Sequence, residues 1–152
     1  FEHLARAVQL EPEQADYRIR LADAAERLGR TEVAVTHYTR ALEIDAKQVV
    51  AMNNLAWILA SDPDAARRDA PRAVTLPEQP VTLTERKNPN ILSTLSVAYA
   101  NAGRFDDALA VAGEALKLAD QAGNHPLAER LRARIELYED RKPYRRAARG
   151  GS

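Results

Sequence analysis

Histidines are the residues of this chain whose type most readily supports catalysis or metal binding. The three histidines, His3, His37 and His125, lie far apart in the sequence. None has a neighbouring serine or aspartate in the arrangement of a catalytic triad. No two of them have the spacing at which one helix holds a metal ion. The sequence therefore predicts no catalytic residue, no metal site and no enzyme activity.

An acidic cluster, Asp62, Asp64 and Asp69, is the nearest approach to a cation-binding loop. The glycine and the bidentate glutamate of an EF-hand loop are missing from it. The chain also lacks a glycine-rich phosphate loop, and it has no cysteine, which excludes disulfides and thiolate metal sites. We expect no cofactor, and the localisation stays unknown.

The charge balance argues against electrostatic partners, because 22 basic residues face 22 acidic ones. No apolar run approaches the ~18 residues needed to span a bilayer. We therefore expect neither a nucleic-acid partner nor insertion into a membrane. A basic run near the end of the chain leaves a phosphate or an acidic partner open as an alternative to a soluble terminus. It consists of Arg141, Lys142, Arg145, Arg146 and Arg149.

Seven residues recur at a fixed spacing, which is typical of proteins built from stacked repeats. They are Leu21, Ala24, Gly29, Arg30, Ala34, Ala41 and Leu42, which return as Leu95, Ala98, Gly103, Arg104, Ala108, Ala115 and Leu116. Apolar residues at helical spacing predict helices over 1–11, 15–28, 31–45, 48–60, 89–102, 105–122 and 124–140. Gly29 and Gly103 would each end the first helix of a pair. A single pair cannot bury its apolar face, so the pairs must stack.

The third helix pair departs from this period. The turn at Asp62-Pro63-Asp64 is lengthened, and Asp69 is placed to cap the helix that follows. Pro77 and Pro80 then fall at helix-interior positions, where a proline removes a hydrogen bond and clashes with the preceding turn. We predict a short helix over 71–76 and irregular backbone to about Asn88. A functional hinge or a local defect stays an alternative.

These patterns resemble the tetratricopeptide repeat, a helix–turn–helix unit of about 34 residues. The matching residues are Ala22, Gly29, Ala34, Tyr38 and Ala41, and then Ser96, Tyr99, Gly103, Phe105, Ala108 and Ala115. Two stretches, Asn53-Asn54-Leu55-Ala56-Trp57 and Lys142-Pro143-Tyr144-Arg145, are similar to the carboxy-terminal repeats of bacterial proteins of this family. The resemblance implies an all-α fold, an α-solenoid of stacked antiparallel helix pairs with a C-terminal capping helix.

The domain organisation follows from the repeats. We expect one tetratricopeptide-repeat domain over 1–140 and a flexible basic tail over 141–152. Within the domain we expect a half repeat, a regular repeat, an irregular repeat with the proline break, a regular repeat and a capping helix, over 1–12, 13–46, 47–87, 88–122 and 124–140. Since the first helix has no partner before it, residue 1 is interpreted as lying inside a larger protein.

The resemblance implies a concave binding face lined by the first helix of each repeat. The expected partner-binding residues are Asn53, Asn54, Trp57, Asp23, Asn90, Ser93, Val97 and Asn101. An amide such as Asn54 both donates to and accepts from a peptide backbone, and Trp57 offers apolar area with one donor. A core position for Trp57 and a surface amide for Asn54 stay open as alternatives.

The predicted function is a non-catalytic scaffold that binds a protein or an extended peptide on this face. The lysines and arginine with which one subtype of the family grips a peptide carboxylate are absent, so an acidic chaperone-type tail is not expected. One alternative is a substrate-docking or regulatory arm of a larger enzyme such as a glycosyltransferase. A second is self-assembly, in which case the chain forms a homo-oligomer.

Overall fold

The computed structural model describes residues 1–148, which form eight α-helices and one short 3-10 helix and contain no strand. The predicted all-α fold of helix pairs packed in chain order is confirmed. Residues 149–152, the end of the predicted tail, lie outside the described residues. The chain divides into two compact units, residues 1–55 and 56–147, with the boundary inside helix α4 (Val49–Ser61).

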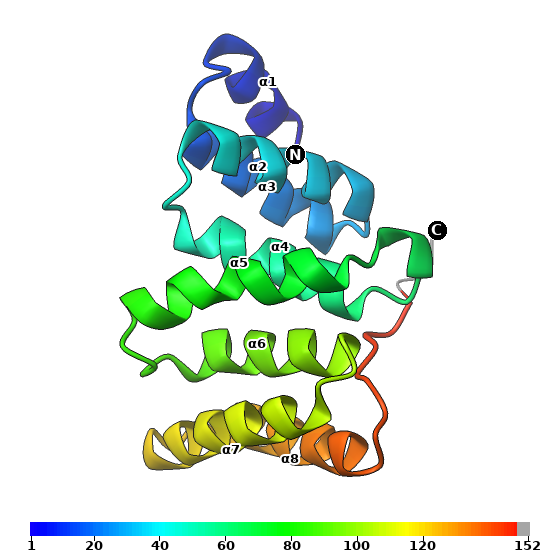
Figure 1. Ribbon diagram of the computed structural model, residues 1–152. Coiled ribbons are helices and arrows are strands. Elements are labelled where there is room, and N and C mark those ends of the chain that lie inside the picture. Colours follow the sequence, from blue (N-terminus) through cyan, green and yellow to red (C-terminus); the bar gives the residue numbers. More distant parts are fainter. Residues whose placement is uncertain (149–152) are drawn as a thin grey trace. The chain divides into compact units, whose positions relative to one another are not determined.

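The first unit contains α1 (Glu2–Leu10), α2 (Ala15–Arg27), α3 (Thr31–Ile44) and the first half of α4. Helix α2 packs against α3, and α1 packs against α2 (Figure 1). Small residues make the contacts between the helices. Ala22, Ala25, Ala34 and Ala41 are all fully buried. Alanine adds little bulk between two backbones, so the paired helices approach closely.

The turns between paired helices use glycine for its backbone freedom, as the sequence predicts. Gly29 has a φ of 72° and Gly103 a φ of 77°, in the left-handed region that glycine adopts without strain. Each turn is closed by the same backbone bond. The Arg30 N–H donates to the Ala25 carbonyl at 2.8 Å, and the Arg104 N–H donates to the Tyr99 carbonyl at 2.9 Å. The residues that recur in the sequence thus form the same backbone hydrogen bond in both repeats.

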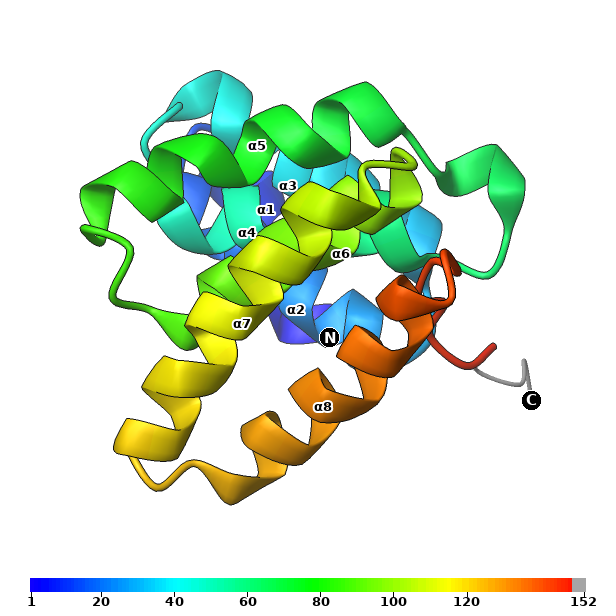
Figure 2. The same cartoon turned by 60° about the horizontal axis from the view of Figure 1, so that its bottom comes forward.

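The second unit contains the end of α4 and five further elements. These are η1 (Ala65–Arg67), α5 (Ala70–Leu83), α6 (Pro89–Asn101), α7 (Phe105–Gln121) and α8 (His125–Glu139). Successive helices from α5 to α8 pack in chain order, and α8 also contacts α6. A short turn joins α7 to α8 (Figure 2). Helix α6 lies at the centre of this unit, and every residue from 91 to 98 is buried.

Side-chain caps begin three of these helices, including the one that the sequence indicates at Asp69. The Asp69 carboxylate accepts from the Arg72 N–H at 3.1 Å. The Asn88 side chain accepts from the N–H groups of Asn90 and Ile91. The Asn124 side chain accepts from the Leu127 N–H at 3.3 Å. Each cap satisfies N–H groups that have no partner within the helix.

The predicted break at Pro77 and Pro80 is wrong, because α5 continues through both prolines to Leu83. Burial explains the difference. Both pyrrolidine rings are fully buried in the unit where α5 packs on α6. Each proline costs a helix ~3 kcal/mol. Burying the three ring methylenes returns roughly 2 kcal/mol. Burial of the rings therefore offsets most of the cost of the prolines to the helix. The sequence shows that cost but not the packing that offsets it.

We expect Pro80→Ala to stabilise the protein by about 1 kcal/mol. Alanine restores a helical N–H donor and gains ~3 kcal/mol of helix propensity, while it loses roughly 1.6 kcal/mol of buried methylene and some chain stiffness. Urea unfolding followed by circular dichroism measures the change. Pro71→Ala is the matched control, because a first-turn proline costs the helix nothing. A Pro80→Ala protein less stable than the wild type would contradict the explanation given for α5.

Candidate functional site

The three histidines singled out in the sequence differ in burial. His3 and His125 are exposed in different units, and His37 lies half-buried on α3. Burial, and then the charge of Arg18, lower the pKa of His37. Within residues 1–148 there is no group of three histidine, cysteine, aspartate or glutamate side chains placed to hold a metal ion. Among the described helices none has both the length and the apolar character required to cross a membrane.

The predicted site residues of the first unit belong to one hydrogen-bonded network. The hydroxyl of the buried Tyr38 donates to Asp23, and the Asn54 amide donates to both Asp23 and the Tyr38 oxygen at 3.2 Å each. Burial, and then the bond to Asp23, raise the pKa of Tyr38, which keeps the phenol protonated as the donor. Asn54 and Asp23 therefore link α2, α3 and α4 within this unit.

Asn53 differs from its neighbour. Its amide nitrogen donates to the Asn54 side chain at 3.4 Å, whereas its carbonyl oxygen is buried and has no partner among the described residues. An unpaired buried acceptor costs free energy until a donor reaches it. Of the three predicted residues in this unit, Asn53 is the one with unused hydrogen-bonding capacity.

The predicted residues of the second unit differ in accessibility. Val97 is fully buried and Ser93 is nearly so, since both lie on the central helix α6. Asn90 is exposed, and Asn101 and Trp57 are half-buried. The structure thus places Val97 in the core, while Trp57 keeps part of its ring at the surface. Trp57 also contacts both an aromatic ring and an arginine of this unit.

An arginine lies beside two aromatic rings, those of Trp57 and Tyr144. The Arg134 guanidinium is 4.9 Å from the Trp57 ring centroid and 4.6 Å from that of Tyr144. The two rings are 5.6 Å apart and tilted. Arg134 is only 6% exposed, and it donates to the Ser93 hydroxyl at 2.6 Å. Burial lowers the pKa of Arg134. No carboxylate pairs with it within residues 1–148, so the two π faces and Ser93 stabilise this charge.

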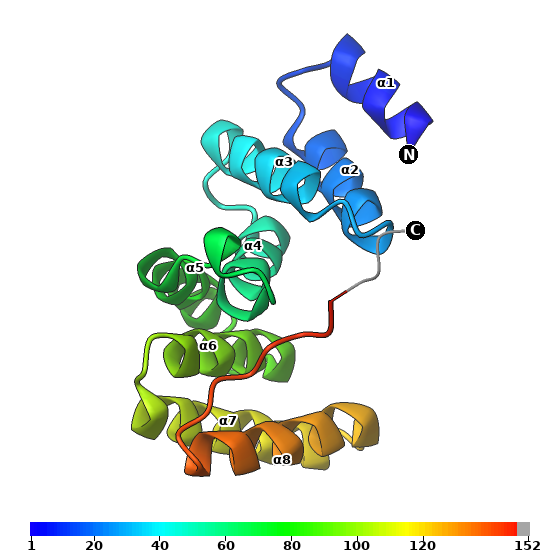
Figure 3. The same ribbon diagram turned by 90° about the vertical axis from the view of Figure 1, so that its right-hand side faces the viewer.

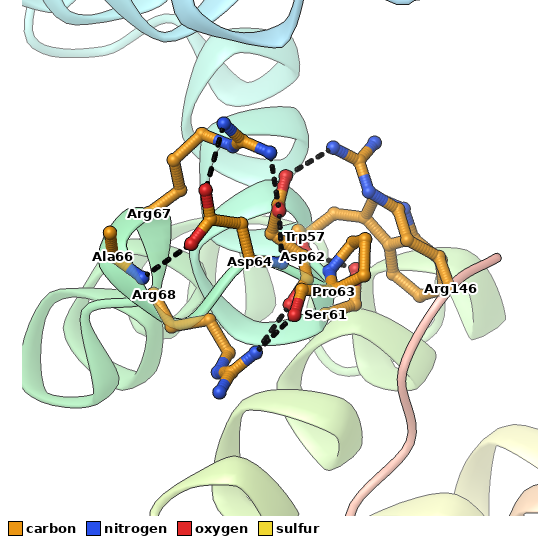
Figure 4. A network of polar contacts seen from close by, with 9 residues as sticks. All are labelled: Trp57, Ser61, Asp62, Pro63, Asp64, Ala66, Arg67, Arg68 and Arg146. Atoms are coloured by element: carbon orange, nitrogen blue, oxygen red, sulfur yellow. Dashed lines mark hydrogen bonds and ion pairs between the residues drawn. The ribbon is translucent and has the colours of Figure 1, made fainter. Parts of the chain in front are cut away.

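Asp62 follows directly after the last residue of α4, and its carboxylate is only 1% exposed. It accepts from Arg146 at 2.7 Å, from Arg67 at 3.2 Å and from the backbone N–H of Asp64 at 2.8 Å (Figure 4). Burial alone would raise the pKa of Asp62. The hydrogen bonds from Arg146 and Arg67 outweigh burial and hold that pKa below its ordinary value. Asp62 is therefore a buried negative charge with two cationic partners.

The segment after α8 contributes residues to both the aromatic contacts of Trp57 and the ion pairs of Asp62. Residues 142–147, here called the tail segment, run from α8 past α6 to the end of α4 (Figure 3). The Arg146 N–H donates to the Ser61 carbonyl at 3.0 Å, and the Arg145 guanidinium donates to the Ala60 carbonyl at 3.2 Å. Ser61 ends α4, so its carbonyl has no partner within the helix. The positive side chains also complement the negative end of the helix dipole.

This placement differs from the flexible tail predicted from residue 141. Tyr144, Arg145 and Arg146 are half-buried and have specific partners some 80 residues earlier in the chain, such as Asp62 at a separation of 84. From the sequence alone, the partners of these basic residues are not visible, and the run is therefore interpreted as a solvated terminus. The pattern Lys142-Pro143-Tyr144-Arg145 carried the only signal, because proline disfavours helix and tyrosine favours a buried ring contact.

Asp62 predicts an acid limit to stability. Its pKa is depressed in the folded chain, so the ionised carboxylate stabilises the fold fully above the unfolded value of about 3.9. That contribution is lost as the pH falls through the lower folded value. We expect the stability difference between wild type and Asp62→Asn, from urea unfolding, to be constant from pH 7 to about 5 and to shrink below about 4. A difference unchanged down to pH 2 would refute this role of the charge.

A comparison with protein families finds a match in this chain. Residues 15–48 match a family model described as tetratricopeptide repeat, and the match begins with α2 and ends just before α4. Together with the helix pairs packed in chain order, this match supports the assignment to the tetratricopeptide-repeat family that the sequence predicts. A comparison with curated proteins finds no match. Repeats of this family generally mediate protein–protein interactions and are typically non-catalytic, which supports a scaffold role for the chain.

Proposed function

We propose that this scaffold binds a partner protein through an extended segment of that partner. One observation carries the proposal. The surface formed by the end of α4 together with α6 and α8 already holds an extended piece of polypeptide, the tail segment. A surface that binds one extended segment has the groups needed to bind another.

The groups on this surface match the features of an extended peptide one by one. The ring of Trp57, with Arg134 beside it, receives an aromatic side chain. The carbonyl of Ser61 accepts a backbone N–H, and the buried carboxylate of Asp62 receives an arginine. We call these four residues the tail-binding surface. Backbone contacts of this kind contribute affinity, and the side-chain contacts contribute specificity.

In the first unit, Asn53 is the residue that supports partner binding. Its buried carbonyl oxygen lacks a donor among the described residues, and a peptide N–H would satisfy it once the half-buried side chain turns outward. Asn54 and Asp23 would act by holding the helix that carries Asn53, since their side chains bond to each other. Asn90 and Asn101 remain predicted contacts of the second unit, with side chains that reach the surface.

A peptide-display experiment tests the proposal without knowledge of the partner. A library of random 12-residue peptides on phage is panned on the wild-type chain and on Tyr144→Ala, which loosens the tail segment. We expect enriched peptides, and we expect Trp57→Ala to bind them at least 10-fold more weakly than wild type. Tyr99→Ala is the matched control, because Tyr99 is a half-buried aromatic of the same unit that contacts Arg104 instead.

Two outcomes would overturn the proposal. One is the absence of any enriched peptide on both chains while circular dichroism shows that both are helical. The other is enrichment that Trp57→Ala and Tyr99→Ala reduce equally. Asn53→Ala, measured on the same enriched peptides, reports separately on the predicted contact in the first unit.

A further inference from the structure

The tail segment contacts its surface in a fixed register. Tyr144 and Arg146 are two residues apart, and side chains two apart in an extended chain point to the same side. The Tyr144 ring lies 5.6 Å from that of Trp57, while the Arg146 guanidinium is 2.7 Å from Asp62. The Arg146 N–H then donates to Ser61 at 3.0 Å. The recognised pattern is an aromatic residue two positions before an arginine.

The tail-binding surface has internal support that does not depend on the tail. Asp62 retains Arg67 at 3.2 Å and the Asp64 N–H at 2.8 Å when Arg146 is set aside (Figure 4). Arg134 likewise retains Ser93 at 2.6 Å and the face of Trp57. Among the described residues of this surface, only the Ser61 carbonyl, whose donor is the Arg146 N–H, loses its partner when the tail is set aside. The surface is therefore preformed, as a binding site is, and can exist with the tail undocked.

We propose that the tail segment is a resident pseudo-ligand, and that the surface serves a partner protein presenting an extended segment with the same pattern. That segment carries an aromatic side chain for Trp57, any residue next, and an arginine for Asp62. The negative charge of Asp62 and its burial favour a cationic side chain at that position and disfavour an acidic one, because a charge-assisted hydrogen bond compensates the buried carboxylate. This inference rests on the proposed function and specifies the chemistry of the partner.

Tethering makes the tail an intramolecular competitor. Only a few residues separate the end of α8 at Glu139 from Tyr144, so the tail is present at an effective concentration in the mM range. A partner segment that makes the same contacts must displace it. The apparent affinity for the partner equals the intrinsic affinity multiplied by the fraction of molecules whose surface is vacant. Undocking the tail therefore raises the affinity for a partner without any new contact.

The test uses a fluorescein-labelled peptide with the sequence of residues 142–147 and the full chain. Binding is followed by fluorescence anisotropy for wild type, for the double variant Tyr144→Ala with Arg146→Ala, and for Lys142→Ala. We expect the double variant to bind the peptide at least 10-fold more tightly than wild type. Lys142→Ala should match wild type, because Lys142 is exposed and its hydrogen bond, from its N–H to the Leu137 carbonyl, is a backbone one.

Peptide variants test the register on the same double variant. Replacing the peptide tyrosine or its second arginine by alanine should weaken binding at least 10-fold. Replacing the first arginine, which reaches only main-chain carbonyls of Ala60 and Tyr144, should weaken it far less. Equal losses at both arginines would mean that only net charge is recognised, and this would overturn the inference.

Further outcomes decide the remaining cases. A double variant that stays helical yet binds no labelled peptide at mM concentration overturns the inference, and peptides enriched from the random library would then leave the proposed function standing. If the double variant unfolds, Arg146→Gln replaces it, and peptide binding no tighter than that of wild type is decisive against the inference. Wild type that dimerises in light scattering, with the dimer lost in the double variant, makes a second copy the occupant and also overturns it.

Discussion

Asp62→Ala is expected to lower the free energy of unfolding by about 2–4 kcal/mol. Removing one partner of a buried ion pair costs up to ~3–5 kcal/mol, because the remaining charges are left desolvated. The side chains of Arg146 and Arg67 keep 13% and 30% of their exposure, which places the loss below the top of that range. The hydrogen bond from the Asp64 N–H is lost as well. Urea unfolding followed by circular dichroism measures the effect.

A matched control distinguishes burial from charge. Asp120→Ala removes an aspartate that also pairs with an arginine, Arg132 at 2.9 Å, but both of these side chains are about half exposed. Exposed pairs contribute roughly 0–1 kcal/mol, so this variant should lose less than about 0.5 kcal/mol. Equal losses for Asp62→Ala and Asp120→Ala would show that the burial of Asp62 adds nothing to stability.

Leu92→Ala is expected to cost about 2–5 kcal/mol, the range for a leucine truncated inside a packed core. Leu92 is fully buried on α6, the central helix of the second unit. The same helix carries Ser93, which holds Arg134 beside Trp57. Loosening α6 should therefore also change the emission of Trp57, the single tryptophan of the chain. Urea unfolding and tryptophan fluorescence follow the two effects in parallel.

Leu83→Ala makes the same substitution on an exposed side chain. Leu83 ends α5 and keeps 57% of its surface exposed, so its truncation leaves no cavity. A change within about 0.5 kcal/mol is expected for such a position. A Leu92→Ala protein as stable as Leu83→Ala would mean that α6 is not the packed centre of its unit.

The helix pairs were predictable because their signals are local. Gly29 and Gly103 end their helices through the same backbone bond, and that bond depends only on residues within one turn. Asn88 and Asn124 cap helices through N–H groups two or three residues ahead. Each of these signals lies within a few residues of sequence, so the sequence of a single chain suffices to predict the helix ends.

The continuous α5 and the docked tail were not predictable, because their causes are distant in sequence. The helix cost of Pro80 is visible locally, whereas the burial that offsets it comes from packing against α6. Arg146 resembles a solvated residue until Asp62, 84 positions earlier, is placed beside it. Favourable contacts between distant segments override local preference in both cases.

The candidate site was predicted in part. The sequence singled out Trp57 and Asn54 and left their surroundings open. Trp57 turns out to be covered by Arg134 and Tyr144, and Asn54 is engaged with Tyr38. The partners come from other helices or from the tail, so no spacing rule within one repeat identifies them. Whether these residues contact a partner stays a prediction.

Nuclear magnetic resonance of the wild-type chain tests most directly whether the tail segment occupies its surface. With Arg134 lying 4.9 Å and 4.6 Å from the two ring centroids, its side-chain protons should be shifted upfield by both ring currents. Nuclear Overhauser contacts should connect the Tyr144 ring with the Trp57 indole. Random-coil shifts throughout residues 142–147, with no contact between the two rings, would contradict the account.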